Sequence, residues 1–484
     1  MLFNSHIFML LFLPLLLAGW YFLNWKKKFQ LAQGYLIGMS LWFYAYANLQ
    51  YLWLLLFSCL IGWLLSCLPE KIFSEKGKKV LTGVGCVFHL GLLGYFKYSN
   101  FFLENLNTVF HTDFPMLQIL LPVGISFYTF QQLAYLIDRC RGDAPRDSFF
   151  DYLTFMVYFP QLLQGPILLR SEFMGQLKEP ERRRFHAERF SEGIQFFVFG
   201  LAKKVLLADT LAKAVNYGYS NVSMLDSISA LLLAELYFDF SGYCDMAVGL
   251  GKMIGLEVAE NFDAPFHSAS VKEFWRRWHM TLGRFFTRYV YIPLGGNRRG
   301  KMRTLCNVMI VMLLSGLWHG AAWTFVLWGF LHGVGMIWDN LEHPHLPKKW
   351  MRQAATFAYV CMTFVFFRAE SIAQGVDVLK SIVSLKWNGF VFQMASALDM
   401  TECYMITKAL SVQLPGLLSW FWLGIFVVLI AICFRVLSGE KVSGVVALQR
   451  QKGYGRLYPV LLAVLFTWSM ISMTGVSEYL YFSF

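Results

Sequence analysis

Long apolar runs, separated by clusters of lysine and arginine, constrain the fold of this chain more than any other feature. Residues 6–23, 51–68 and 417–433 reach or approach the ~20 apolar residues that cross a bilayer. Of the 484 residues, 57% are hydrophobic and only 15% are charged, more apolar surface than a soluble domain of this size can bury. The sequence therefore predicts an all-α polytopic integral membrane protein.

The basic clusters give the orientation of the predicted spans. A net charge of +12 is also compatible with nucleic-acid binding, but the basic residues lie at the ends of apolar runs, which is the positive-inside pattern. We therefore expect no nucleic acid partner. The first run has no basic residue before it and is followed by Lys26, Lys27 and Lys28, so we interpret it as a span and not as a signal peptide.

Placing each basic cluster in the cytoplasm predicts about 11–12 transmembrane helices and puts both termini outside. The expected spans are 7–25, 31–48, 50–68, 79–98, 118–138, 190–216, 228–255, 304–320, 322–340, 353–368, 416–436 and 457–474. Residues 149–169 contain Pro160, Gly165 and Pro166, which predicts broken backbone that enters and leaves on the cytoplasmic side. The nine cysteines lack CxxC spacing, so neither a disulfide framework nor a metal site is expected.

Residues 271–289 have apolar side chains within one arc of a helical wheel, so an amphipathic helix is predicted there. His279 lies at the border of the apolar arc, and the opposite face carries Lys272, Arg276, Arg277, Arg284 and Arg288. One interpretation is an interfacial helix with its arginines on lipid phosphates. The alternative is that these cations, with the turn at residues 295–300 (GGNRRG), bind a polyphosphate donor such as coenzyme A.

Four further residues carry polar groups inside apolar runs. His319 is expected ~24 Å above the basic turn, in the outer half of the membrane, where a neutral imidazole is either a general base or a hydrogen-bonded structural residue. The same reasoning applies with less force to His332. Glu235 and Asp239 need partners at such depth, either in structural pairing or along a cavity.

An ordered series of motifs makes the prediction more specific. The series comprises residues 237–243 (YFDFSGY), 260–262 (ENF), 273–279 (EFWRRWH), 294–298 (LGGNR) and 316–321 (GLWHGA). It resembles the alginate O-acetyltransferase-like bacterial branch of the membrane-bound O-acyltransferase (MBOAT) family, and the likeness covers nearly the whole chain. The resemblance implies helices and re-entrant or interfacial elements around a central tunnel or funnel, with His319 catalytic and His279 a second functional histidine.

The resemblance also implies acetyl-CoA as donor substrate, with no permanently bound cofactor. For the donor we single out Arg276, Arg277, Asn297 and Arg298, together with Trp318 beside the catalytic histidine. Residues 479–484 (YLYFSF) resemble an aromatic-x-Tyr-x-x-Phe hexapeptide of envelope acylation systems, in which the tyrosine matching Tyr481 is thought to carry the acyl group. The alternative for this tail is an interfacial aromatic belt.

We expect one membrane domain over residues 1–484, with N-terminal helices (1–147), a catalytic core (148–340), C-terminal helices (341–474) and an extracytoplasmic tail (475–484). The expected function is transfer of acetyl groups across the bacterial cytoplasmic membrane to an SGNH-type serine O-acetyltransferase, which modifies a cell-envelope or secreted polysaccharide. Two alternatives remain open. One is a glycan transporter or flippase, for which no inverted repeat is visible, and the other is an MBOAT protein that acylates a lipid or a protein.

Overall fold

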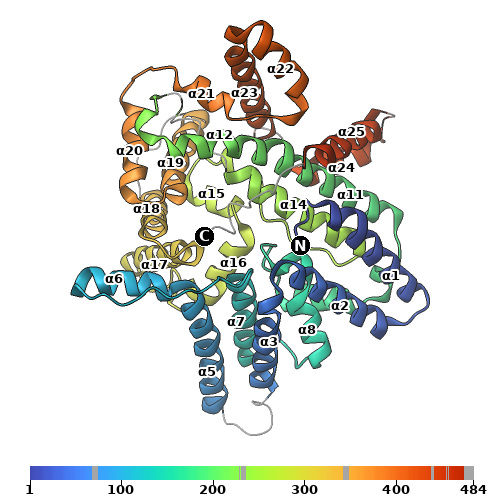
Figure 1. Cartoon of the computed structure of the whole chain (residues 1–484). Helices are drawn as coiled ribbons and strands as arrows, with labels where there is room; N and C mark the ends of the chain where they lie inside the picture. The colour runs from blue at the N-terminus through green and yellow to red at the C-terminus, as the bar shows by residue number, and fades with distance from the viewer. Residues whose placement is uncertain are drawn as a thin grey trace. The chain divides into compact units, whose positions relative to one another are not determined.

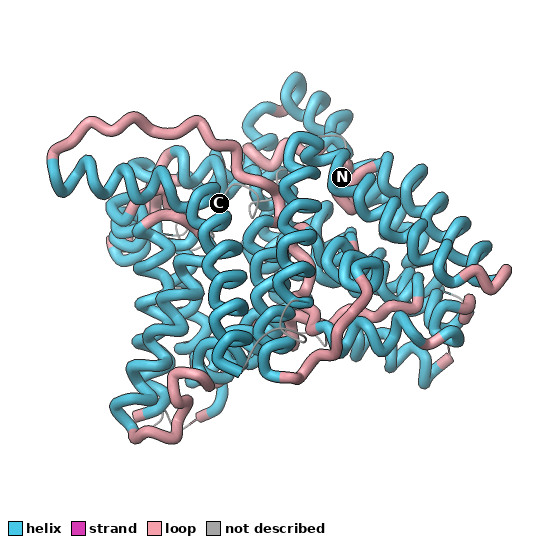
Figure 2. Tube along the Cα trace, turned by 90° about the horizontal axis from the view of Figure 1, so that it is seen from below, coloured by secondary structure: helices cyan, strands magenta, loops and turns pink. Residues whose placement is uncertain are grey.

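All the regular structure that we can describe is helical. The computed structural model describes residues 1–67, 75–227, 229, 236–341, 348–437, 441–453, 455 and 457–473, and no strand occurs among them (Figure 2). Helices satisfy their backbone hydrogen bonds within one segment, which is what a lipid environment requires. The all-α prediction is confirmed.

The helices fall into two compact units, each described by itself. One contains residues 1–197, 244–260 and 284–290, and the other contains residues 198–243, 261–283 and 291–484. The helices of the first unit (Figure 1) are α1 (Leu13–Trp25), α2 (Phe29–Asn48), α3 (Leu52–Cys67), α5 (Glu75–Leu93), α6 (Ser99–Phe110), α7 (Ile125–Arg141), α8 (Phe149–Val157), α9 (Phe159–Leu162) and α10 (Arg170–Lys178). Three of the described α-helices have residues in both units: α11 (Ala187–Ala202), α14 (Leu236–Ile254) and α16 (Met280–Phe286).

The second unit holds the C-terminal helices. They are the π-helical turn η5 (Lys203–Ala208), α12 (Asp209–Ser220), α15 (Val271–Arg277), α17 (Lys301–His319), α18 (Trp323–Asn340), α19 (Lys349–Arg368), α20 (Ile372–Val383), α21 (Phe390–Ser396), α22 (Tyr404–Gln413), α23 (Pro415–Leu437), α24 (Val442–Lys452) and α25 (Leu457–Ser472). Helices α17 and α18 lie side by side (Figure 1). A Cβ atom at Gly316 would lie 2.3 Å from the Phe325 carbonyl oxygen and 3.3 Å from the Gly329 Cα atom, so small residues let these two backbones touch.

Five helical stretches among the described residues are long and apolar enough to cross a membrane. They are Phe8–Trp25, Phe29–Cys67, Lys76–Phe110, Lys301–His319 and Pro415–Cys433. The spans expected at 31–48 and 50–68 are therefore joined in one stretch of 39 residues.

The span expected at 118–138 is wrong in its first part. Helix α7 begins only at Ile125, after Pro122 and the left-handed Gly124 (φ +78°). In the non-helical segment before α7, the backbone of Phe114 forms two hydrogen bonds of 2.9 Å with the side-chain amide of Asn107 in α6. The backbone of Leu117 forms two of 2.8–2.9 Å with the side-chain amide of Asn100 in the same helix. These amides replace the hydrogen bonds that a helix would supply.

The backbone of residues 149–169 is broken and mostly buried, as predicted. Helix α8 stops at Val157, the single turn α9 follows, and residues 166–169 have no regular secondary structure. A Cβ atom at Gly165 would lie 2.1 Å from the Pro160 carbonyl oxygen, so the turn requires glycine. The membrane face on which this segment opens remains a prediction.

Candidate active site

His279 lies in a break between two short helices, not within one amphipathic helix. Helix α15 ends at Arg277 and α16 begins at Met280, and His279 has a left-handed backbone (φ +45°) that residues other than glycine seldom adopt. The expectation of one continuous helix over residues 271–289 is therefore wrong. The reason is competition for backbone hydrogen bonds, because Asp263 N donates to Arg277 O (2.9 Å) and Met280 N donates to Asn261 O (3.0 Å).

The side chain of Asn261 orients His279. Its Oδ1 atom accepts hydrogen bonds from Thr281 N (3.1 Å) and Thr281 Oγ1 (2.8 Å) and lies 3.4 Å from His279 Nδ1. Since this oxygen can only accept, Nδ1 carries the ring proton and Nε2 keeps its lone pair. Among the described residues, Nε2 has no hydrogen-bond partner. Full burial lowers the pKa of His279, so the imidazole is neutral and has a basic nitrogen available.

His319 closes α17 and faces His279. The two ring centroids are 6.2 Å apart, and the Trp318 ring lies 6.0 Å from the His279 ring and 5.0 Å from the His319 ring. Trp328 of α18 and Phe367 of α19 pack against His319 at 5.1 and 5.2 Å. The structure therefore brings His279, His319 and Trp318 together among buried aromatic rings.

His332 has a structural role, because both of its ring nitrogens are occupied. Nδ1 accepts a hydrogen bond from Trp275 Nε1 (3.2 Å), so Nε2 carries the proton and donates to Thr363 Oγ1 (2.9 Å). The Thr363 hydroxyl in turn donates to Val360 O (2.7 Å). No basic nitrogen is left for chemistry.

The carboxylate of Asp239, which lies in an apolar run of the sequence, is paired with a lysine, as one of the two alternatives predicted. Lys204 of η5 is buried and lies 2.6 Å from carboxylate oxygens of both Asp209 and Asp239. The residue after Asp239, Phe240, packs against the His279 ring at 4.8 Å. The first turn of α14 therefore forms one wall of the site, while Glu235 lies outside the described residues.

The residues singled out for the donor do not form one cluster. Arg276 is exposed, whereas Arg277 pairs with Glu273 (3.0 Å). Asn297 and Arg298 are exposed in the turn before α17. Helix α17 has 19 residues, so this turn and Trp318 are separated by most of a helix length of ~28 Å.

The basic turn is anchored by a residue that the sequence did not single out. Asn307 of α17 is buried, and its Nδ2 atom donates to Gly296 O at 2.9 Å. Gly295, Gly296 and Gly300 all have positive φ, which explains the glycine content of the turn. The turn therefore has a defined shape and presents exposed cations.

Arg284 and Arg288 are held by carboxylates of the first unit, not left free for phosphate. Arg284 forms two hydrogen bonds with the carboxylate of Glu172, and Arg288 lies 3.0 Å from Asp138 and 2.8 Å from Asp143. These pairs fix the chain that follows His279 to α10 and α7. Neither arginine is a candidate for binding the donor.

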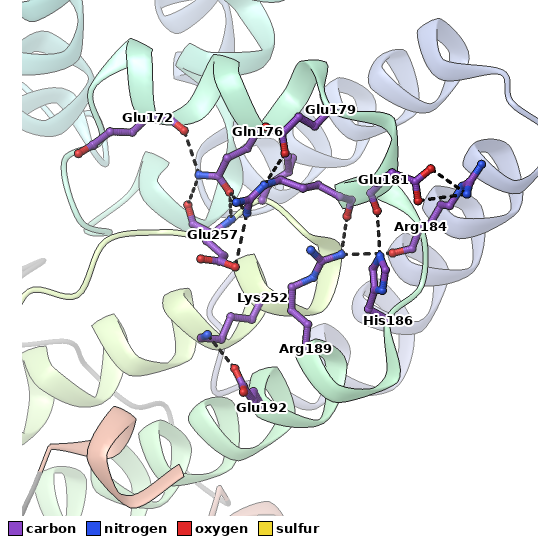
Figure 3. A network of polar contacts seen from close by, with 12 residues as sticks. Glu172, Gln176, Glu179, Glu181, Arg184, His186, Arg189, Glu192, Lys252 and Glu257 are labelled. Atoms are coloured by element: carbon purple, nitrogen blue, oxygen red, sulfur yellow. Dashed lines mark hydrogen bonds and ion pairs between the residues drawn. The ribbon is translucent and has the colours of Figure 1, made fainter. Parts of the chain in front are cut away.

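The basic cluster at residues 170–189 also contains its own counter-ions (Figure 3). Arg182 lies 2.8 Å from Glu179 and 3.5 Å from Glu257, and Arg184 lies 2.8 Å from Glu181. Gln176 joins the same network through its hydrogen bonds to the backbone of Glu257 (Figure 3). This network connects the segment after α10 to the chain that follows α14.

Two features of the site were not found from the sequence, and Tyr481 lies outside the described residues. Asn261 stood within the ENF motif, but its spacing of 18 residues from His279 gives no periodic signal. Trp328 was one aromatic residue among many in an apolar run. Only the folded structure places both beside the histidines.

A helical apolar chain with two histidines meeting in a buried aromatic site has the characteristics of a membrane-bound acyltransferase. Residues 141–373 match the model of "MBOAT, membrane-bound O-acyltransferase family". The chain is 35% identical to a peptidoglycan O-acetyltransferase of Helicobacter pylori, with 80% of each chain covered. It is 39% identical to a probable alginate O-acetylase AlgI of Pseudomonas putida, covering 77% of this chain and 78% of that one.

A more distant relative is a teichoic acid D-alanyltransferase of Streptococcus thermophilus. It is 28% identical over 48% of this chain and 58% of that one. The extent and identity of the first two matches show that the chain belongs to the MBOAT family. It is therefore a multi-pass membrane protein and an O-acyltransferase.

Proposed function

We propose that this O-acyltransferase takes acetyl groups from cytoplasmic acetyl-CoA and passes them, through an acyl-tyrosine at Tyr481, to an extracytoplasmic acetyltransferase that modifies a polysaccharide. The observation that carries the proposal is the pairing of two buried histidines, of which His279 is neutral and has a free basic nitrogen. Relatives named as acetylating peptidoglycan and alginate support acetyl as the acyl group and a glycan as the final acceptor.

In the proposed reaction, the hydroxyl oxygen of Tyr481 attacks the thioester carbon of acetyl-CoA. His319 accepts the phenolic proton as general base, and His279 orients or assists. The bond between carbon and sulfur then breaks, and the sulfur leaves as the thiol of coenzyme A after receiving that proton. One acetyl group has then moved to the tyrosine, with no net loss or gain of protons.

The donor would bind along α17. Arg298 and Asn297 would hold phosphate groups at the start of this helix, while the thioester would lie near Trp318 and His319 at its end. Arginine suits phosphate because it is always charged and presents several donors. Arg276 is the second exposed cation proposed for the donor, whereas Arg277 would have to leave Glu273.

For the partner, we propose an SGNH-type serine O-acetyltransferase on the extracytoplasmic side. This requires both termini to be outside the bacterial cytoplasmic membrane, as the basic clusters predict. Because the membrane is impermeable to acetyl-CoA, the tyrosine would let the cell acetylate a polymer without exporting the coenzyme.

The proposal is tested with full-length protein in liposomes, radiolabelled acetyl-CoA and the partner with its glycan. Wild-type protein should carry label on the C-terminal peptide and then pass it on. His319→Ala and Tyr481→Phe should abolish this transfer, whereas the control Tyr479→Phe should retain it because phenylalanine keeps an aromatic ring there. Full acetylation by both inactive variants would refute the scheme.

The alternatives give different results in the same system. A glycan flippase would move substrate without consuming acetyl-CoA, and a lipid or protein acyltransferase would prefer longer acyl-CoA donors and would not need Tyr481. A D-alanyl donor, suggested by the more distant relative, would leave acetyl-CoA unused.

A further inference from the structure

Trp328 carries a hydrogen-bond donor for which the described part of the chain supplies no acceptor. Its side chain is fully buried in α18, and its Nε1 atom has no hydrogen-bond partner among the described residues. A buried donor without an acceptor costs about 1–3 kcal/mol. Such groups are rare in folded proteins and each calls for an explanation, such as a ligand that supplies the missing acceptor.

The described neighbours of Trp328 are aromatic rings, and none of them offers a free acceptor to its N–H. Its ring centroid lies 5.1 Å from His319, 4.8 Å from His332 and 5.2 Å from Phe367. The acceptor nitrogen of His332 is already taken by the other indole of this layer, since Trp275 Nε1 donates to it at 3.2 Å. An indole N–H can only donate, so no acceptor for Trp328 Nε1 remains among the described residues.

We propose that Trp328 Nε1 donates a hydrogen bond to the carbonyl oxygen of the acyl donor and stabilises the oxyanion formed there. This inference rests on the proposed acyl transfer. When the acceptor oxygen attacks the thioester carbon, the carbonyl π electrons move onto the carbonyl oxygen, which accepts the hydrogen bond from the indole. They return to the carbon as the carbon–sulfur bond breaks and the sulfur leaves with the proton held by His319.

The environment makes such a donor effective. The indole is fully buried among aromatic rings, so its fixed dipole would act on the developing charge in a medium of low dielectric constant. The indole is also held in advance by Phe367, Phe364 and Trp275. It therefore needs no reorganisation when the oxyanion forms.

The first test compares Trp328→Phe with the matched control Trp275→Phe. Both variants keep an aromatic ring and lose one indole N–H, but of these two donors only that of Trp275 has an acceptor among the described residues. Trp328→Phe should lower kcat by about 10²–10³-fold with KM changed little, and Trp275→Phe should lower it far less. Equal kcat values for wild type and Trp328→Phe, or equal losses in both variants, would overturn the inference.

A second test observes the indole directly in protein labelled with ¹⁵N-tryptophan. The Trp328 resonance is assigned by its absence from Trp328→Phe, and acetyl-CoA is added to His319→Ala protein, which cannot turn over. We expect this resonance to move downfield and the Trp275 resonance to stay; an unmoved Trp328 resonance contradicts the inference.

If wild type transfers no label to Tyr481, the proposed function fails. If wild type and Trp328→Phe transfer label at equal rates, only this inference fails.

Discussion

Asn261 determines which nitrogen of His279 is available for chemistry. The amide oxygen accepts three donors and holds the proton on Nδ1, which leaves Nε2 as a base in a buried site. His279 has a left-handed backbone between two helices, and Asn261 binds the backbone at the same point. The two residues therefore act together. The family resemblance identified His279, but its protonation depends on a neighbour supplied by a separate loop.

Asn261→Asp tests this dependence. A carboxylate beside Nδ1 favours the protonated imidazole, so the pKa of His279 should rise. His279 can assist through the lone pair on Nε2 only while its imidazole is neutral, so this contribution to activity is lost as the pH falls through its pKa. The acidic limb of the kcat/KM profile should therefore move to higher pH. If the acidic limb of the kcat/KM profile were identical to that of wild type, the protonation of His279 would not limit activity.

The lowered pKa of His279 also predicts how stability depends on pH. Its folded-state pKa lies below the unfolded value of about 6.5, so the unfolded chain binds a proton that the folded chain does not. The His279 contribution to the free energy of unfolding is complete above pH ~6.5 and is lost as the pH falls below it. Thermal unfolding in detergent from pH 7.5 to 5 should show this loss. His279→Gln should have a shallower slope, and equal slopes would contradict the prediction.

At the scale of helices, the sequence predicted most elements and failed where distant segments compete for the backbone. The spans expected at 304–320, 322–340 and 353–368 correspond to α17, α18 and α19, because apolar runs of helical length have few alternatives. The helix over 271–289 failed because residues 261–263 bind its backbone, and periodicity within a window cannot detect that. The motifs identified both histidines, whereas Asn261 and Trp328 required the packing of helices and loops.

The close contact of α17 and α18 predicts a sensitive glycine. In Gly316→Ala the new Cβ atom would lie 2.3 Å from Phe325 O, so the two helices must separate and His319 must move relative to Trp328. We expect a lower unfolding temperature and loss of most activity. The control is Gly424→Ala in α23, where a Cβ atom meets nothing within 4 Å and helix propensity improves slightly. Similar behaviour of the two variants would show that the contact is not tight.

At the scale of the whole molecule, the cations divide into those that hold the fold and those left for a ligand. Arg182, Arg284 and Arg288 are bound to carboxylates, whereas Arg276 and Arg298 are exposed. Net charge alone does not separate these groups, because a clustered arginine looks the same in sequence whether or not an acid meets it in the fold.

Arg298→Ala should therefore weaken donor binding without disturbing the chemistry. Loss of one charged hydrogen bond, about 1.5 kcal/mol or more, should raise KM for acetyl-CoA about tenfold and leave kcat nearly unchanged, with a smaller difference at high salt. Lys380→Ala, which removes an exposed cation paired with Asp377, is the control for net charge. A fall in kcat with unchanged KM would argue against phosphate binding at this turn.

A single helix of 19 residues, α17, joins the glycine-rich turn to His319. If phosphate groups bind at its first residues and the acyl group reacts at its last, the length of α17 determines how long the donor must be. A long carrier molecule then fits both ends at once, while a short activated ester, however reactive, reaches only one.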